Sequence, residues 1–185
     1  SLRSGIPDDY PTPTLVTAEA LTRMGRRRYV VTPGQSGCQV WLMTVILSGV
    51  HYAVAIPCAD LQGRRGPRVW PLDIQFTARA YQGTLLRGVS YREGQTRHYV
   101  VEDIYRQSRS RRMEELRTFI NQAIRMTETM RLHRALLYET RDLQSMTSLV
   151  RRVREDGLVR LQSLVFSPES WGGPVYIYYP PPADL

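Results

Sequence analysis

Residues 40–58 read VWLMTVILSGVHYAVAIPC, and this stretch decides how the chain folds. It contains no aspartate, glutamate, arginine or lysine, a property that it shares with membrane spans. Ser48 and Gly49 divide it into two apolar runs of strand length, however, and His51 and Pro57 suit a bilayer poorly. Two apolar runs joined by a turn are typical of a β-hairpin with buried strands. We therefore expect two core strands here and no membrane span.

The composition is that of a folded domain with a basic surface. Of the 185 residues, 42% are hydrophobic and 23% are charged, a balance that is typical of globular proteins. The formal net charge of +8 suits contact with nucleic acid, nucleotides or an acidic protein. We expect residues 1–24 to form an arm with a short helix over 17–24, residues 25–182 to form one domain, and residues 183–185 to form a tail.

Reactions that need the side-chain amine of lysine are excluded, because the chain contains arginine but no lysine. No ε-amine is available for a Schiff base, a lysyl–nucleotide intermediate or a P-loop. The two cysteines, Cys38 and Cys58, form neither a zinc set nor a disulfide framework. The three histidines, His51, His98 and His133, do not have the spacing of a zinc site. The sequence therefore predicts neither a metal site nor a cofactor.

Short strands dominate the secondary structure that we expect outside the hairpin. Strands are expected over 29–32, 74–81, 85–91, 98–104 and 133–139, with one or two more within 156–168, and a last aromatic strand over 174–179 is expected to stop at the prolines 180–182. Apolar residues within 110–130 recur mostly every three or four positions, which predicts an amphipathic helix. Thr140 can cap a second helix, which carries Val150 and Val153 on its apolar face. The expected fold class is α+β, with antiparallel sheets and two late helices.

Five stretches resemble, in order, the motifs of one family: VTPGQSGCQ (31–39), YQGTLLRGVSY (81–91), HYVVEDIYRQSRSRRMEELR (98–117), REDGLV (154–159) and VYIYYPPP (175–182). The family is the nucleotidyltransferase domain shared by mRNA capping enzymes, ATP-dependent DNA and RNA ligases, and the cap-binding domain of snurportin. The resemblance covers roughly residues 25–182. It implies a nucleotidyltransferase-like domain, here without the OB-fold domain that follows in capping enzymes and ligases.

The chain departs from that family at the residues that carry its chemistry. Gly34 stands where the family has its nucleophilic lysine, Ser36 where it has an acidic residue, and Gln39 where it has an arginine. The family's Asp-Gly-Glu motif reads RGV at 87–89, and Tyr179 replaces a lysine of the last motif. Covalent nucleotidyl transfer needs an amine nucleophile and carboxylates that hold a metal ion. We therefore expect a non-catalytic domain and not an enzyme.

The resemblance also implies where a ligand would bind. The expected ligand-binding residues are Gly34, Ser36, Gln39, Arg87, Asp156, Trp171 and Tyr179. An aromatic face such as that of Trp171 can stack on a methylated cap base, although aromatic residues in strands more often belong to a core. Phosphate could be held by Arg26, Arg27, Arg28, Arg64, Arg65, Arg111 and Arg112. The same arginines could instead form a solvated face.

Two functions are consistent with the sequence. The first is a snurportin-like, non-catalytic domain that binds RNA, an mRNA cap, a nucleotide or a protein partner. The second is a structural subunit of a virion or ribonucleoprotein, whose Pro-rich segments 7–13 and 180–182 tie neighbouring molecules together. Either function would place the protein inside the cell, in the nucleus or cytoplasm, or in a virion.

Overall fold

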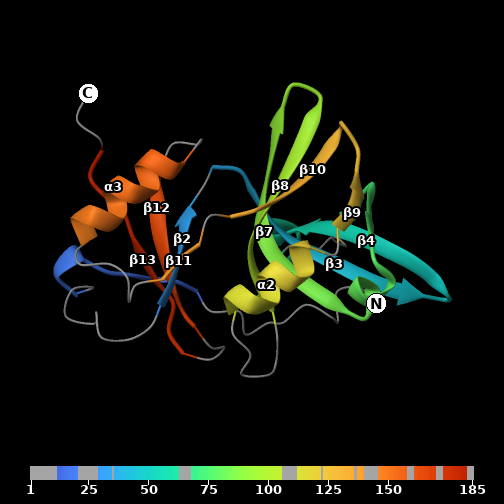
Figure 1. The fold of residues 1–185 in the computed structure, drawn as a ribbon, viewed down its shortest axis with the longest axis horizontal. Coiled ribbons are helices and arrows are strands. Elements are labelled where there is room, and N and C mark those ends of the chain that lie inside the picture. Colours follow the sequence, from blue (N-terminus) through green and yellow to red (C-terminus); the bar gives the residue numbers. More distant parts are fainter. Residues whose placement is uncertain are drawn as a thin grey trace. The chain divides into compact units, whose positions relative to one another are not determined.

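Strands dominate the fold, and they form two main sheets (Figure 1). The computed structural model describes residues 12–20, 29–34, 36–62, 68–105, 112–121, 123–135, 137–139, 146–157, 161–169 and 173–182. The chain divides into two compact units. The first unit consists mainly of residues 37–108 and 114–135, and the second mainly of residues 10–36 and 136–185.

A six-stranded sheet forms the first unit, with its strands in the order β10-β8-β7-β3-β4-β5. The strands are β3 (Cys38–Leu47), β4 (Val50–Pro57), β5 (Trp70–Pro71), β7 (Thr84–Glu93), β8 (Thr96–Tyr105) and β10 (Met130–Arg134). Neighbours are antiparallel, except that β10 runs parallel to β8. Ser48 and Gly49 join β3 to β4 with φ values of 50° and 77°, as a tight hairpin turn requires. The predicted hairpin is therefore confirmed, although its tip is exposed.

Several short elements accompany this sheet in the first unit. The 3-10 helix η3 (Ala78–Tyr81) lies on one face of the sheet, because Thr44 Oγ1 donates a 2.5 Å hydrogen bond to the carbonyl oxygen of Ala80. The strands β6 (Ile74–Phe76) and β9 (Ala123–Met126) pair in a separate two-stranded sheet. A further 3-10 helix, η2 (Cys58–Gln62), directly follows β4. The opposite face of the six-stranded sheet carries Trp41 and Arg87, which stand directly opposite each other on β3 and β7.

The prediction of one long helix over 110–130 was wrong for the second half of that segment. Helix α2 spans Arg112–Ile120, and strands β9 and β10 follow it. The apolar residues after Ile120 form strands because β6 and β8 offer them pairing partners, which local spacing does not reveal. The prediction of a single strand over 133–139 was also wrong. Its ends belong to β10 and to β11 (Tyr138–Glu139), which lie in different sheets.

A five-stranded sheet forms the second unit, in the order β1-β13-β12-β2-β11. The remaining strands are β1 (Thr14–Leu15), β2 (Tyr29–Gly34), β12 (Ser163–Pro168) and β13 (Tyr176–Tyr178). Helix α3 (Met146–Asp156) packs Leu149 and Val153 into a core with Val31, Leu164 and Phe166. The aromatic strand β13 ends before the prolines, as the sequence predicted.

The expected fold class was wrong. The fold is mostly β, with two main sheets, one of them a half-barrel, and few helices. It is not the α+β nucleotidyltransferase domain with two late helices that the resemblance implied, because much of the expected helical segment pairs as strands instead. Among the described residues, no helix is both long and apolar enough to cross a bilayer.

Candidate ligand groove beside helix α3

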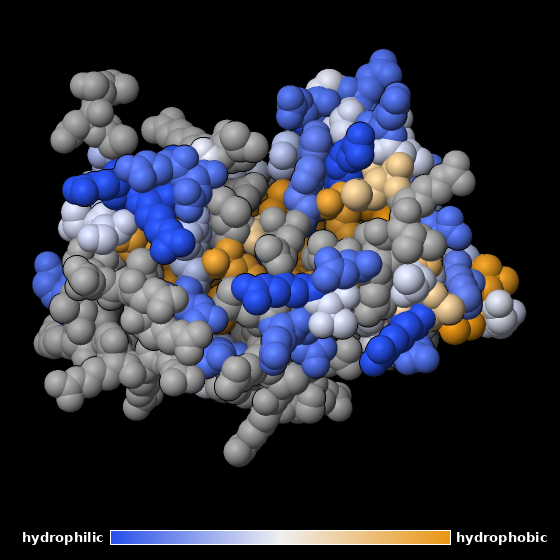
Figure 2. All heavy atoms as spheres, in the orientation of Figure 1, coloured by the Kyte–Doolittle hydropathy of each residue, from blue (hydrophilic) through white to orange (hydrophobic). Residues whose placement is uncertain are grey.

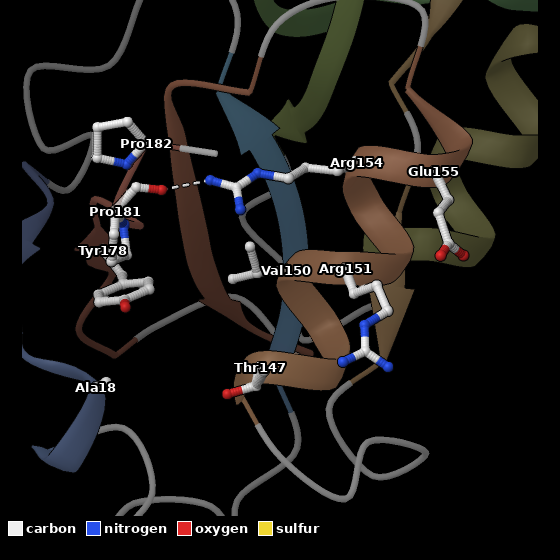
Figure 3. A pocket seen from close by; sticks show the side chains of 9 residues that line it. All are labelled: Ala18, Thr147, Val150, Arg151, Arg154, Glu155, Tyr178, Pro181 and Pro182. Atoms are coloured by element: carbon white, nitrogen blue, oxygen red, sulfur yellow. Dashed lines mark hydrogen bonds between the residues drawn. The ribbon is translucent and has the colours of Figure 1, made fainter. Parts of the chain in front are cut away.

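A groove of about 610 Å³ lies between helix α3 and the C-terminal segment of the second unit (Figure 3). It is lined by Ala18, Thr147, Val150, Arg151, Arg154, Glu155, Tyr178, Pro181 and Pro182. All of these residues belong to the second unit. A volume of this size is typical of sites that bind a small molecule or cofactor.

One stripe of α3 forms the first wall of the groove. Thr147, Val150, Arg151 and Arg154 are spaced at i, i+3, i+4 and i+7, so they share one side of the helix. Val150 is 8% exposed and also contacts the core, whereas the two arginines are exposed. The wall therefore has an apolar floor and a cationic rim.

The second wall comes from the end of β13 and the prolines after it. Tyr178 is half-buried at the last position of the strand, and prolines cannot continue a ladder because they lack an N–H. Arg154 extends across the groove and donates a hydrogen bond to the carbonyl oxygen of Pro181 (Figure 3). This bond connects the two walls at one place and leaves the ring of Tyr178 beside the groove.

A small polar cluster holds the other side of α3 in place. The Tyr138 hydroxyl donates a 2.9 Å hydrogen bond to Oδ2 of Asp156, and Arg152 Nε lies 3.9 Å from the same oxygen. The Arg152 guanidinium also lies 5.5 Å from the centre of the Tyr138 ring. Burial, and then the bond to Asp156, raises the pKa of Tyr138 to about 12. The hydroxyl therefore stays protonated and remains a donor at neutral pH.

The electrostatics of the groove favour an anion. Arg151 is exposed at the rim, and it forms no ion pair with any residue that the structure describes. Glu155 is the one carboxylate in the lining, against two arginines. An aromatic ring and a guanidinium beside one cavity can bind a planar ring by stacking and a phosphate by charge-assisted hydrogen bonds.

Two of the residues predicted to bind a ligand, Gly34 and Ser36, lie beside residues of the second unit's β12 segment. Gly34 ends β2 opposite Ser163, and a side chain there would collide with that serine. The hydroxyl of Ser36 accepts a hydrogen bond from Nε2 of Gln162. Tyr179 is 58% exposed, immediately after the groove residue Tyr178. The structure thus brings Gly34 and Ser36 to the β2–β12 pair, and Tyr179 next to the groove.

Two other predicted residues, Gln39 and Arg87, meet on the first unit. Arg87 donates a 3.0 Å hydrogen bond to Oε1 of Gln39, and its guanidinium lies 4.8 Å from the Trp41 ring centre.

Glu102, which the sequence analysis did not select, lies near enough for Arg87 to affect its titration. Burial raises the pKa of Glu102 to about 7, although Arg87 acts in the opposite direction. Its Oε1 atom is buried and accepts no hydrogen bond from the described residues.

The remaining predicted positions lie outside the described residues. They are Arg26, Arg27, Arg28, Arg64, Arg65, Arg111 and Trp171, together with the side chain of Arg112. The groove arginines Arg151 and Arg154 were missed by the sequence analysis. Their spacing on one side of the expected helix could have indicated a shared surface. The opposite wall could not be predicted in this way, because it comes from a distant part of the chain. In the part of the chain that the structure describes, no group of three or more His, Cys, Asp or Glu side chains could hold a metal ion.

Comparison with known proteins gives a distant viral relative. No family model matches the chain. The chain is similar to "Uncharacterized protein L308" of Acanthamoeba polyphaga mimivirus, with 22% identity over 166 residues. The match covers 85% of this chain and 51% of that protein, so the chain spans about half the length of the curated relative it matches. The relative's name states no activity.

Proposed function

We propose that the chain is a non-catalytic binding domain whose groove beside α3 takes a nucleotide, an mRNA cap or a short segment of RNA. The observation that carries this proposal is that Tyr178 and Arg151 line the same groove. The tyrosine ring offers a stacking surface for a base, and the guanidinium offers bidentate hydrogen bonds to a phosphate. The net charge of +8 adds a general attraction for a polyanion.

The chemistry of the groove supports binding more than catalysis. Its lining includes neither histidine nor cysteine, and its single carboxylate, Glu155, is exposed. General acid–base catalysis commonly uses a group whose pKa is tuned toward neutrality, and covalent nucleotidyl transfer needs an amine that this lysine-free chain does not offer in its side chains. Stacking and phosphate contacts, by contrast, need only the residues that are present.

A titration with fluorescently labelled single-stranded RNA, and competition by GTP and by a methylated cap analogue, tests this proposal. Tyr178→Ala should weaken binding about tenfold, because one stacked base contributes about 1–3 kcal/mol. Tyr178→Phe should bind like the unmodified chain, since it keeps the ring. Tyr179→Ala is the matched control, because this adjacent, exposed tyrosine does not line the groove.

The binding data are interpretable only if the variants fold, which circular dichroism and thermal unfolding would check. An unmodified chain that binds neither RNA nor either nucleotide at low salt would contradict the proposal. Equal affinities of the Tyr178→Ala and Tyr179→Ala variants would instead remove the groove from the binding site.

A structural role in an assembly is the second candidate, and the tip of the β3–β4 hairpin favours it. Figure 2 shows apolar residues gathered at the free end of this hairpin. They are Ile46, Leu47, Val50 and Tyr52, each between 43% and 50% exposed. Apolar side chains that gather on a surface are a common mark of protein interfaces. Similarity to a protein of a virus is consistent with such a role.

Sedimentation velocity separates this second candidate from the first. Under a structural role, the chain should self-associate, and a Leu47→Lys, Val50→Lys double variant should abolish the association. A monomer at all concentrations that binds RNA would favour the first candidate alone.

A further inference from the structure

Two histidines on neighbouring strands of the first unit lie side by side on one face of the sheet. His98 lies on β8 and His133 on β10, and the parallel register places His133 beside Val100, two residues along from His98. The two rings therefore project from the same face of the sheet. His98 is half-buried, and His133 is exposed.

Their nitrogens lie within hydrogen-bonding distance. Nδ1 of His98 and Nε2 of His133 are 2.9 Å apart, the ring centres are 5.1 Å apart, and the ring planes differ by 22°. One nitrogen must carry a proton and the other must accept it. The pair thus already directs two imidazole nitrogens toward one point.

Residues of β7 hold the ring of His98 from two sides. Tyr91 stacks on it, with ring centres 4.9 Å apart and planes that differ by 12°. Oε2 of Glu93 lies 3.8 Å from Nε2 of His98. A histidine that binds a metal through one nitrogen commonly directs its other N–H toward a carboxylate, which fixes the tautomer. Glu93 occupies the position of that carboxylate.

We propose that His98 and His133 form a binding site for a divalent transition-metal ion of the Zn²⁺ class, through Nδ1 of His98 and Nε2 of His133. Imidazole nitrogens are preferred ligands of Zn²⁺, Ni²⁺ and Cu²⁺. Two nitrogens that bond one tetrahedral ion at about 2.05 Å are about 3.3 Å apart. The observed separation is within a few tenths of an ångström of that value, so small rotations of the two rings suffice.

Metal binding requires that the proton shared by the two histidines leave the nitrogens that face each other. When the ion binds, Nδ1 of His98 must be free of its proton, and the neutral tautomer then carries it on Nε2, beside Glu93. Burial, His98 and Arg131 all lower the pKa of His133. The charge of Arg131 opposes the ion, and the carboxylate of Glu93 offsets part of that repulsion.

The site is open and has two protein ligands, so water completes the coordination. Closed structural sites have four protein ligands, and we therefore expect weaker binding than at such a site. The site lies in the first unit, so it does not depend on the groove of the second unit.

Calorimetric titration with Zn²⁺ at about neutral pH tests the proposal. The titrated protein carries Cys38→Ser, because the exposed thiol of Cys38 would add its own heat of binding. We expect one ion per chain, and at least tenfold weaker binding in the His98→Asn and His133→Asn variants. His51→Asn is the matched control, since the His51 ring stacks on Tyr81 in the hairpin region and not on either of the other two histidines.

A second measurement identifies the ligands directly. Electron paramagnetic resonance of the Cu²⁺-loaded protein should show hyperfine coupling to two imidazole nitrogens, reduced to one in either single variant. An absence of Zn²⁺ binding at millimolar concentration would overturn the proposal. Unchanged binding in the His98→Asn, His133→Asn double variant, confirmed as folded by circular dichroism, would overturn it as well.

Discussion

The hydroxyl of Tyr138 donates a 2.9 Å hydrogen bond to Oδ2 of Asp156. Tyr138 is 7% exposed on β11, and Asp156 is the last residue of α3, so this bond joins the end of the helix to the sheet. The helix carries the arginine wall of the groove. The sequence analysis predicted Asp156 as a ligand-binding residue, and the structure shows it bonded to Tyr138 at the end of the helix that lines the candidate groove.

We expect Tyr138→Phe to lower the free energy of unfolding by about 1 kcal/mol, because the variant keeps the ring and loses one hydrogen bond. Urea denaturation followed by circular dichroism measures this difference. Tyr179→Phe is the control, since Tyr179 is exposed, and it should leave the midpoint unchanged. Equal midpoints for the two variants would mean that the bond to Asp156 does not stabilise the fold.

Gly88 should be intolerant of any side chain. It lies where the β7–β8 register shifts, and a Cβ atom at this position would collide with the backbone carbonyl oxygen of Val100. Because a backbone atom of a central strand cannot move aside, we expect Gly88→Ala to cost about 3 kcal/mol of stability. At Gly49 a Cβ atom would meet open space, and the φ of 77° alone should make Gly49→Ala cost about 1 kcal/mol. Chemical denaturation of both variants ranks the two costs, and a smaller loss at Gly88 would contradict the prediction.

The two hairpins could be predicted from the sequence because their signals are local. The Ser48-Gly49 pair separates two apolar runs, and the turn residues Gly94-Gln95 separate the expected strands 85–91 and 98–104, which the structure has as β7 and β8. The segment after Ile120 could not be predicted in this way. Its apolar spacing fits a helix, and only the pairing of β9 with β6 and of β10 with β8 makes strands more stable.

The same distinction applies to the candidate site. Arg151 and Arg154 share one side of a helix that the sequence predicted, so this wall of the groove could have been predicted from the local sequence. Tyr178 lies opposite them because β12 lies between β13 and β2, a pairing that no local pattern encodes. The resemblance selected Gly34 and Ser36 as ligand-binding residues, and the structure pairs Gly34 with Ser163 and bonds Ser36 to Gln162.

The titration of Glu102 should make stability depend on pH. Its pKa rises from the ordinary value of 4.5 to about 7 on folding, mainly because of burial. Between these values the native state holds a proton that the unfolded state has released. Stability therefore falls as pH increases from about 4.5 to about 7, by about 3 kcal/mol in total for this group.

We expect Glu102→Gln to remove this contribution, because glutamine stays neutral when buried. Denaturation at about pH 5 and about pH 8 should show a gain in the stability of Glu102→Gln over the unmodified chain at the higher pH only. Glu114→Gln, at an exposed position on α2, is the control and should show no such difference. A gain that is the same at both pH values would contradict the proposed titration.

The salt dependence of RNA binding should distinguish Arg151 from its neighbour Arg152. Both are exposed on α3, and replacing either with alanine removes one positive charge. Only Arg151 lines the groove, whereas Arg152 covers the ring of Tyr138. If Arg151 contacts a phosphate, Arg151→Ala should reduce the slope of log K against log salt by about 0.7, the value for one contact to a single strand. Arg152→Ala should leave the slope nearly unchanged. Equal reductions in both variants would show that RNA responds to net charge alone and that the groove does not hold a specific phosphate.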